Sequence, residues 1–252
     1  MVIGDIILDE YQFVKPLGMA SKSNTIAARL LTSELYAGGV LAVVNHIANF
    51  VEKVVLVTNI GKNKEADYYN FIYQKLPSNI EFQPLTTPER AITLKRRFID
   101  ITFKQKIFES VEINEEPLSY QQRKKLLTIL KKVLKKHLDL IVIADFGHGL
   151  LDQETVSYIC QQPFFLAVNA QTNSANRGFN LLTKYPRCDY FCIDREEAQL
   201  ATHDKESDIQ QIHQKLMKKT RAQIGAITLG TDGSYVSKKR QRKGVHAPIL
   251  SR

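Results

Sequence analysis

The sequence predicts an α/β protein, a three-layer sandwich built on a mostly parallel sheet with a small β lid. Short apolar segments alternate with amphipathic segments over most of the 252 residues, as in a sheet covered by helices on both faces. Acidic residues and glycines follow these apolar segments at Asp5, Asp145, Asp194 and Gly230, which is typical of the ligand-binding edge of such a sheet. Two strand-like segments that interrupt the alternation predict the lid.

The composition indicates one folded domain with a basic surface. Hydrophobic residues make up 44%, and 35 Lys and Arg against 26 Asp and Glu give a net charge of +9. This charge favours an anionic partner such as a phosphorylated metabolite, a nucleotide or a nucleic acid. The sequence has no apolar run of membrane-spanning length, no signal-peptide pattern and no zinc-like cysteine spacing. We therefore expect a cytoplasmic protein that does not bind a membrane.

The opening segment, Val2–Tyr11, predicts a buried strand that ends at Gly4 and is followed by two carboxylates, Asp5 and Asp9. Carboxylates accept hydrogen bonds from hydroxyl groups, so a polyhydroxylated ligand would suit this position. Alternatively, Asp5 caps a turn and Asp9 is solvated. The residues alone leave both interpretations open.

The next segment, Glu10–Arg29, is expected to be polar and irregular. Gly38 and Gly39 precede a buried helix predicted over Leu41–Phe50. This glycine pair allows close approach of the backbone to a ligand, or it forms a plain turn. A strand, a helix and a strand are then expected over Lys53–Asn59, Lys64–Leu76 and Ile80–Pro84.

The lid is expected from residues 10–39 and 91–111. Ala91–Ile99 alternates with a period of two and should pair with Lys106–Val111. This alternation places Lys95 and Arg97 on one face, where they would meet a phosphate group; equally, they belong to a solvated edge strand.

The second half continues the alternation. Ser119–His137 predicts a helix with a capping box from Ser119 and Gln122, and its lysine-rich face is either solvated or a nucleic-acid contact. Further strands are expected at Leu140–Ala144, Phe164–Asn169, Asp189–Ile193 and Ala226–Leu229, and a hairpin at Ser234–Lys238 and Val245–Pro248 around the turn Lys239–Lys243. Helices are expected from Asp152 to Gln161 and from Ser207 or Asp208 to Arg221.

Six motifs in register resemble those of the ribokinase-like (PfkB) carbohydrate kinases, and within them the heptose phosphate kinase branch. They are GDIILDEY at Gly4–Tyr11, the pair Gly38-Gly39, Thr93–Arg97 with Gln105–Glu109, Ala144–Leu150, Asp194–Glu197, and Thr228–Gly230 with Gly233. The resemblance extends from Val2 to the last residues and implies a ribokinase-like fold.

The resemblance also implies transfer of a phosphoryl group from ATP to a hydroxyl group of a heptose-like sugar or sugar phosphate, with Mg²⁺, in nucleotide-sugar biosynthesis. It assigns substrate binding to Asp5, Asp9, Gly38, Gly39, Lys95, Arg97 and Asp145. It assigns nucleotide binding to Asp194, Glu197, Thr228, Gly230 and Gly233, with Glu197 also acting on the metal.

The sequence departs from the family pattern in several places. Ala42, His148 and Asp194 stand where the pattern has Asn, Lys and Asn, and the chain stops at Arg252, before the expected D-T-x-G-A-G-D motif with its catalytic Asp. We therefore expect an incomplete kinase domain that is inactive alone, with an exposed apolar sheet face near Thr228. The alternative is a noncatalytic sugar- or nucleotide-binding relative. We do not expect the protein to bind nucleic acid. We expect it to form a homodimer through the lid.

Overall fold

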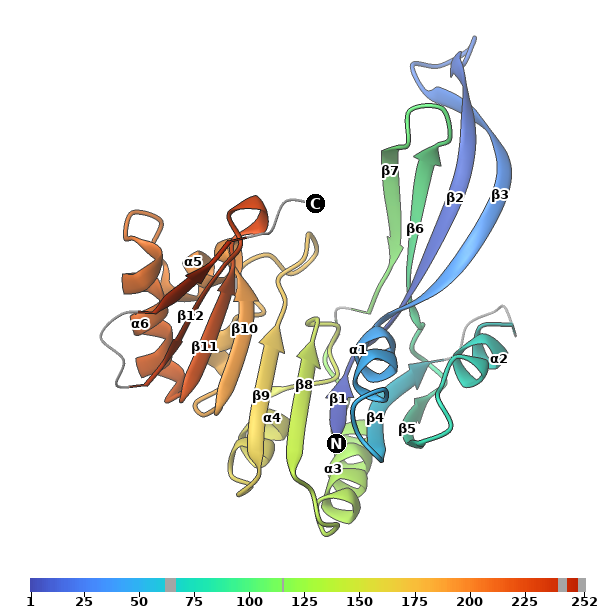
Figure 1. Ribbon diagram of the computed structural model, residues 1–252. Helices are drawn as coiled ribbons and strands as arrows, with labels where there is room; N and C mark the ends of the chain where they lie inside the picture. Colours follow the sequence, from blue (N-terminus) through green and yellow to red (C-terminus); the bar gives the residue numbers. More distant parts are fainter. Residues whose placement is uncertain (62–66, 115, 240–243, 249–252) are drawn as a thin grey trace.

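The computed structural model describes residues 1–61, 67–114, 116–239 and 244–248, and it confirms the predicted α/β architecture (Figure 1). In this part of the chain the main sheet has the order β13-β12-β11-β10-β9-β8-β1-β4-β5 and is parallel apart from β12 and β13. Its strands are β1 Val2–Gly4, β4 Val54–Gly61, β5 Ile80–Thr87, β8 Leu140–Asp145, β9 Phe165–Ala170, β10 Tyr190–Asp194, β11 Ile224–Thr228, β12 Ser234–Lys238 and β13 Val245–Ala247.

A second sheet of order β3-β2-β6-β7 projects from the main sheet (Figure 1). Its strands are β2 Ile6–Met19, β3 Ile26–Gly39, β6 Thr93–Asp100 and β7 Gln105–Glu112. The strand expected at Ala91–Ile99 therefore lies outside the main sheet, as predicted for a lid.

The expectation of an irregular segment over Glu10–Arg29 is wrong, because most of it belongs to the long hairpin of β2 and β3. Much of this hairpin is exposed, so no apolar alternation marks it in the sequence. Pro16 is tolerated because β6 pairs with β2 only as far as Val14. Beyond that point β3 is the only described strand beside β2, and a missing N–H group can face solvent.

The helices are α1 Val40–Ile47, α2 Asp67–Gln74, α3 Tyr120–Val133, α4 Gln153–Cys160, α5 Arg195–Thr202 and α6 Ile209–Thr220, with one-turn 3₁₀ helices η1 Leu182–Lys184 and η2 Gly230–Asp232. The capping box of Ser119 and Gln122 is present. The start of the helix expected at Lys64 and the basic turn at residues 240–243 lie outside the described residues.

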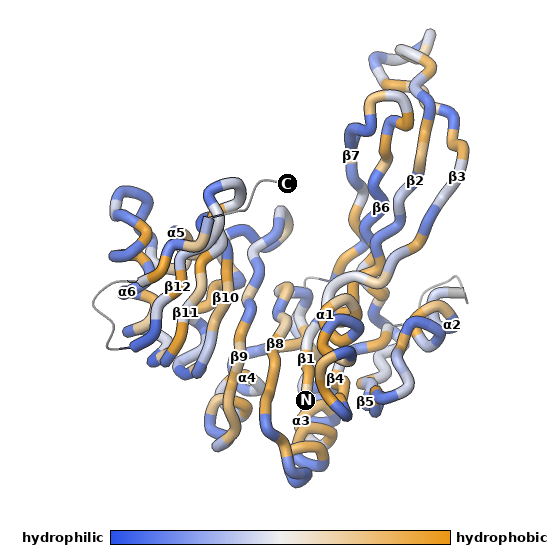
Figure 2. The backbone as a smooth tube through the Cα atoms, in the orientation of Figure 1, coloured by the Kyte–Doolittle hydropathy of each residue, from blue (hydrophilic) through white to orange (hydrophobic). Residues whose placement is uncertain are grey.

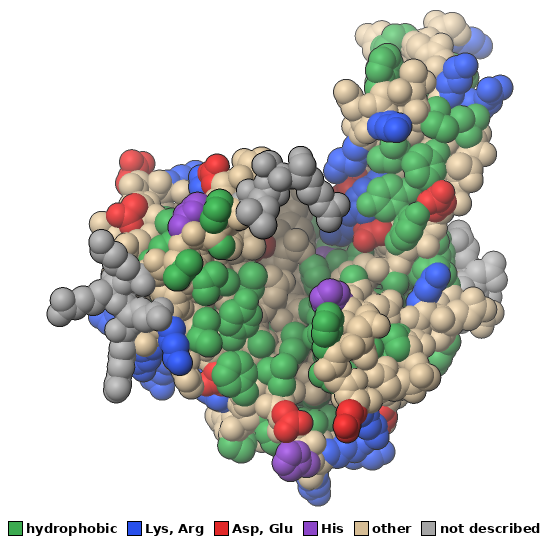
Figure 3. Space-filling view, viewed as in Figure 1, with side chains coloured by type: hydrophobic (Ala, Val, Ile, Leu, Met, Phe, Trp, Pro, Cys, Tyr) green, Lys and Arg blue, Asp and Glu red, His purple; other side chains and the backbone are tan. Residues whose placement is uncertain are grey.

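Two cores fill the two faces of the main sheet. On one face, α3, α4, α5 and α6 pack on a core that includes Ile3 and Ile143 and reaches β12. On the other face, α1 and α2 pack on Val2 and Leu56, and this core reaches only β8. We expected helices on both faces of the sheet, but in the described part of the chain the face that carries α1 and α2 has no helix over β9–β12. Figure 3 shows apolar side chains gathered on this open face, and Figure 2 shows the hydrophobic strands beneath.

None of the helices in the described ranges has both the length and the hydrophobicity that crossing a bilayer requires.

Candidate functional site

The chain leaves the main sheet at Asp5, between β1 and β2, and returns to it through Gly38 and Gly39. Gly39 is the N-cap of α1 with a φ of 57°, and a Cβ atom on it would lie 2.5 Å from the carbonyl oxygen of Asp5. That oxygen accepts a hydrogen bond of 2.9 Å from the N–H of Val40. A glycine is therefore required where the hairpin meets the helix.

Asp9 lies inside β2, paired in register with Tyr36 and Lys95, and not at the end of a central strand as expected. Its carboxylate lies so close to Gly38 that a Cβ atom there would collide with it. The structure thus brings Asp5, Asp9, Gly38 and Gly39 to one junction between the two sheets. Figure 3 shows the molecule hollowed between the second sheet and the β9–β12 half of the main sheet.

Asp5 is a buried carboxyl group next to a second one. Its side chain is only 5% exposed and accepts hydrogen bonds from the N–H groups of Phe146 (3.0 Å) and His148 (3.4 Å). Burial, and then the charge of Asp145, raise the pKa of Asp5 to about 7. Ionisation of Asp5 therefore destabilises the folded state. Buried groups with a pKa shifted in this way are common at functional sites.

Asp145 ends β8 and is 1% exposed, and its carboxylate is fully engaged. It accepts hydrogen bonds from the Tyr185 hydroxyl (2.6 Å), the Gly147 N–H (3.0 Å) and the Asn180 amide (3.3 Å), and it forms an ion pair with Lys184 (2.5 Å). These four donors hold it in place. Asn180, Lys184 and Tyr185 were not found from the sequence, because they belong to a connection without a motif.

The lid cations differ in their partners. Arg97 forms ion pairs with Asp9 and with Glu109 (3.0 Å). Arg96, on the opposite face of β6, pairs with Glu10 (2.6 Å) and Glu112 (2.5 Å).

Lys95 lies on the same face as Arg97, beside Asp9, and forms no ion pair with any described residue. Burial lowers the pKa of Lys95, opposed by the negative charge of Asp9. Of the two residues predicted to meet a phosphate, Arg97 is thus neutralised by two carboxylates, whereas Lys95 has no ion pair among the described residues.

A small polar cavity of about 20 Å³ lies beside Asp5 and is lined by Arg90, Thr93 and His148 among others. This volume holds about one water molecule. Arg90 is 7% exposed and donates to the carbonyl oxygens of His148 (3.1 Å) and Pro117 (3.4 Å), while its Nε atom has no partner among the described residues. Arg90 was missed in the sequence because a single arginine before a strand carries no motif.

His148 links the lid to the main sheet. One ring nitrogen lies 3.2 Å from the Thr93 hydroxyl on β6, and the other lies 3.3 Å from the amide of Asn173 after β9. Burial lowers the pKa of His148 to about 4, so the ring is neutral at neutral pH. A neutral histidine therefore stands where the family pattern has a lysine.

A second cluster lies at the carboxyl ends of β10 and β11. Asp194 is the N-cap of α5, and Glu197 completes a capping box with it. The Glu197 carboxylate accepts hydrogen bonds from the N–H groups of Asp194 (2.8 Å) and Thr172 (3.0 Å), and burial raises its pKa. The helix α5 was not predicted, although an Asp followed three residues later by a Glu is a recognisable start signal.

Asp194 and Glu197 also line a pocket of about 210 Å³ that is open to solvent. In the described part of the chain no group of three or more potential ligand residues could hold a metal on its own. Mg²⁺ usually binds through one or two carboxylates, water and substrate phosphates, and each Glu197 oxygen keeps a lone pair beyond its backbone bond. The residues present therefore fit a Mg²⁺ ion that is carried mainly by a nucleotide.

The three other residues assigned to the nucleotide lie close to this pocket. Thr228 pairs in register with Asp194. Gly230 has a φ of 60° and open space around the position of a Cβ atom, so its backbone is accessible to a ligand. Gly233 is required for another reason, since a Cβ atom there would collide with the backbone of Ala247 in β13. Thr228 and Gly230 thus fit a nucleotide, and Gly233 serves the hairpin.

Comparison with known proteins gives relatives of low sequence identity. The chain is 23% identical over 246 residues to the bifunctional protein HldE of Nitratiruptor sp., covering 94% of this chain and 49% of that protein. It is 24% identical over 192 residues to HldE of Haemophilus influenzae, covering 73% and 38%. The chain therefore spans about half the length of the curated relatives it matches, or less. No protein-family model matches the chain.

Solved structures share the fold. Escherichia coli phosphofructokinase-2 in complex with fructose-6-phosphate superimposes with a TM-score of 0.73 at 11% identity, over 100% of this chain and 80% of that one. Ribokinase from Giardia lamblia gives a TM-score of 0.67 at 17% identity, over 99% and 76%. The chain therefore has the ribokinase-like fold of these structures. Its sequence is similar to that of HldE.

Proposed function

We propose that this chain forms the sugar-binding part and much of the nucleotide-binding part of an ATP-dependent sugar kinase. One observation supports this most: the junction of the two sheets brings together Asp5, Asp9, Gly38 and Gly39, next to Lys95, which has no ion pair with a described residue. Carboxylates orient hydroxyl groups and an ammonium group binds a phosphate, so the acceptor is a phosphorylated sugar. The similarity to HldE favours a heptose phosphate within nucleotide-sugar biosynthesis.

In this proposal Asp5 and Asp9 accept hydrogen bonds from sugar hydroxyl groups, and the glycine pair lets the ring approach the start of α1. Lys95 holds the substrate phosphate, while Arg97 keeps Asp9 oriented through their ion pair. The backbone near Gly230 and Thr228 binds the phosphate chain of the nucleotide, and Glu197 and Asp194 would hold the metal ion that accompanies it. ATP with Mg²⁺ would supply the phosphoryl group and neutralise its charge. The protein then acts mainly by positioning the two substrates.

Of the three described carboxylates around this junction, Asp5 binds the sugar in this proposal, and the other two are already engaged by protein groups. Asp145 is engaged by four donors. Asp9 is paired with Arg97. We therefore propose that residues 1–252 bind the sugar without turning it over at a useful rate, and that a glycine-rich segment carrying an Asp completes the site.

We also propose a homodimer formed through the second sheet. Large apolar side chains are exposed there, including Leu17 and Met19 on β2, Ile26 on β3 and Phe103 in the turn between β6 and β7. Such a patch is typical of a protein interface. Multi-angle light scattering of the wild type beside a Leu17→Ser, Ile26→Ser variant tests this, and a monomeric wild type would contradict it.

The kinase proposal is tested by ³¹P NMR detection of phosphoryl transfer from ATP to heptose phosphates and simpler sugars. Residues 1–252 would be compared with a version extended by a segment carrying the D-T-x-G-A-G-D motif. We expect turnover only in the extended form and its loss in Asp9→Ala. Sugar binding without turnover in both forms would favour the alternative, a noncatalytic binding module. Turnover by residues 1–252 alone would show that another group, with Asp145 the first to mutate, acts as the base.

A further inference from the structure

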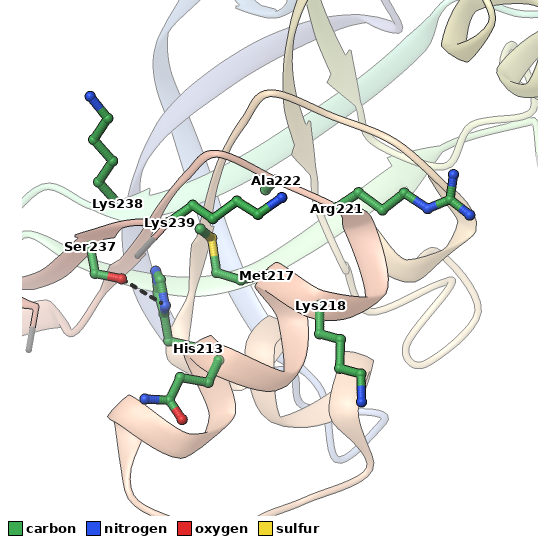
Figure 4. Close-up of a pocket in the computed structure, with 9 residues that line it drawn as sticks. His213, Met217, Lys218, Arg221, Ala222, Ser237, Lys238 and Lys239 are labelled. Atoms are coloured by element: carbon green, nitrogen blue, oxygen red, sulfur yellow. Dashed lines mark hydrogen bonds between the residues drawn. The ribbon is translucent and has the colours of Figure 1, made fainter. Parts of the chain in front are cut away.

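A pocket of about 390 Å³ lies between α6 and β12, away from both clusters described above (Figure 4). The last turn of α6 and the end of β12 meet at the edge where β11 begins, at Ile224. Gly230 and Asp194 lie at the opposite edge, where the parallel strands end. This pocket is therefore separate from the proposed kinase site.

The floor of the pocket is polar and neutral. His213 is buried, with Nε2 2.8 Å from the carbonyl oxygen of Gly225 and Nδ1 3.3 Å from the hydroxyl of Ser237 (Figure 4). Because a carbonyl oxygen only accepts, Nε2 carries the proton and Nδ1 accepts from Ser237. Burial lowers the pKa of His213, so the ring adds no charge at neutral pH. Met217 and Ala222 add an apolar wall.

The rim is strongly basic. Lys218 and Arg221 come from the end of α6, and Lys238 and Lys239 come from the end of β12. No described Asp or Glu lines the pocket, and Lys218, Arg221 and Lys239 form no ion pair with a described residue. Figure 4 shows Lys239 lying across the pocket beside Met217, while Lys218 and Arg221 extend outward. Like charges around one cavity repel one another, and a bound anion would relieve this repulsion.

We propose that this pocket binds a small molecule that carries two or more phosphate groups. Its volume lies within the range of about 300–1,000 Å³ that is usual for small-molecule sites. Cations approach it from two elements, so more than one anionic group can be bound at once. A single-stranded nucleic acid would instead need a groove with aromatic rings for stacking, and no described Phe or Tyr lines this pocket. The small neutral floor with its one hydroxyl group, and the wall with its one thioether, suit a compact ligand.

The test is calorimetric titration of residues 1–252 with tripolyphosphate, pyrophosphate and inorganic phosphate at two salt concentrations. The variant combines Lys218→Ala, Arg221→Ala and Lys239→Ala. The control combines Lys125→Ala, Lys132→Ala and Lys135→Ala, three exposed lysines on or just after α3 that give the same change in net charge. We expect tripolyphosphate to bind at least tenfold more tightly than phosphate, with a tenfold loss in the pocket variant and less than a twofold loss in the control.

Equal losses in the two variants, or no saturable binding by the wild type, would overturn the proposal. It would also be overturned if duplex DNA competed better than tripolyphosphate at equal phosphate concentration. Thermal unfolding checks that the pocket variant is folded, and the single variant Lys239→Ala replaces it if it is not. Binding that survives in the pocket variant and disappears in Gly230→Asp belongs to the proposed nucleotide site and counts against this pocket.

Discussion

Replacing Asp5 by Asn should make the protein more stable at alkaline pH. The pKa of Asp5 is raised to about 7 in the folded protein, against 3.8 for an ordinary Asp, because the group is buried beside Asp145. Between pH 3.8 and about 7, the Asp5 carboxyl group is therefore protonated in the folded state and ionised in the unfolded state. Stability contributed by this group falls as the pH rises from about 4 to 7, and the full cost is present above pH 7.

The size of this cost follows from the difference of about 3 between the two pKa values, which corresponds to roughly 4 kcal/mol at most. Asn keeps an oxygen for the N–H groups of Phe146 and His148, and it removes the charge. We expect Asp5→Asn to raise the free energy of unfolding by about 1–4 kcal/mol at pH 8 and to change it little at pH 4.

Urea unfolding followed by circular dichroism at pH 4, 6 and 8 measures this difference. Asp232→Asn is the matched control, because that side chain is 60% exposed and Arg195, at the surface, is its one ion-pair partner among the described residues. The same small effect is expected for the control at every pH. An Asp5→Asn variant that is destabilised equally at all three pH values would refute the reasoning, since a neutral buried group would then be no better tolerated than a charged one.

Three further predictions follow from the contacts. Lys95→Met should weaken binding of a sugar phosphate roughly tenfold to a hundredfold, whereas Arg96→Met, on the opposite face of β6, should not; isothermal titration calorimetry compares them, and equal losses would contradict the role of Lys95. Lys184→Met should destabilise the fold by about 3–5 kcal/mol, because it leaves the buried Asp145 without its cation. Tyr185→Phe should destabilise it by about 1.5–3 kcal/mol, because Asp145 loses a hydrogen-bond donor. Urea unfolding at pH 7 measures both, and values near zero would show that Asp145 is not held as described. Gly39→Ala should destabilise more than Gly230→Ala, since both have a positive φ but only Gly39 meets backbone atoms; the strain alone is worth about 1–2 kcal/mol, and equal melting temperatures would contradict this.

The main sheet was predictable from the sequence because its strands are apolar and short, and because acidic residues or glycines follow them. Leu140–Asp145 is such a strand, and its neighbour Val2–Gly4 ends in a glycine that is followed by Asp5. The β2–β3 hairpin was not predictable in this way. Its residues face solvent over much of their length, so burial imposes no alternation on them. Helix α5 was missed for a different reason, since its capping signal was present and was interpreted only as part of a motif.

The candidate site shows the same division. Asp5, Asp9, Gly38 and Gly39 could be found because glycines and carboxylates near strand ends are visible in one sequence, and the structure brings them together. The partners that decide their chemistry could not be found. Whether Arg97 or Lys95 is free depends on the register between β2, β6 and β7, and on Glu109 across that register. The engagement of Asp145 depends on a connection 35–40 residues later in the chain.

Calorimetric titration of residues 1–252 with a heptose phosphate, in the wild type and in Asp9→Ala, tests the central claim most directly. Arg97 keeps its ion pair with Glu109 in this variant, so the second sheet retains a partner for that charge. We predict saturable binding of one ligand per chain by the wild type and a loss of roughly tenfold or more in Asp9→Ala, because a ligand hydroxyl loses its charged acceptor. Unchanged affinity in Asp9→Ala, or no binding of any sugar phosphate by the wild type, would contradict the assignment of this junction as a sugar site.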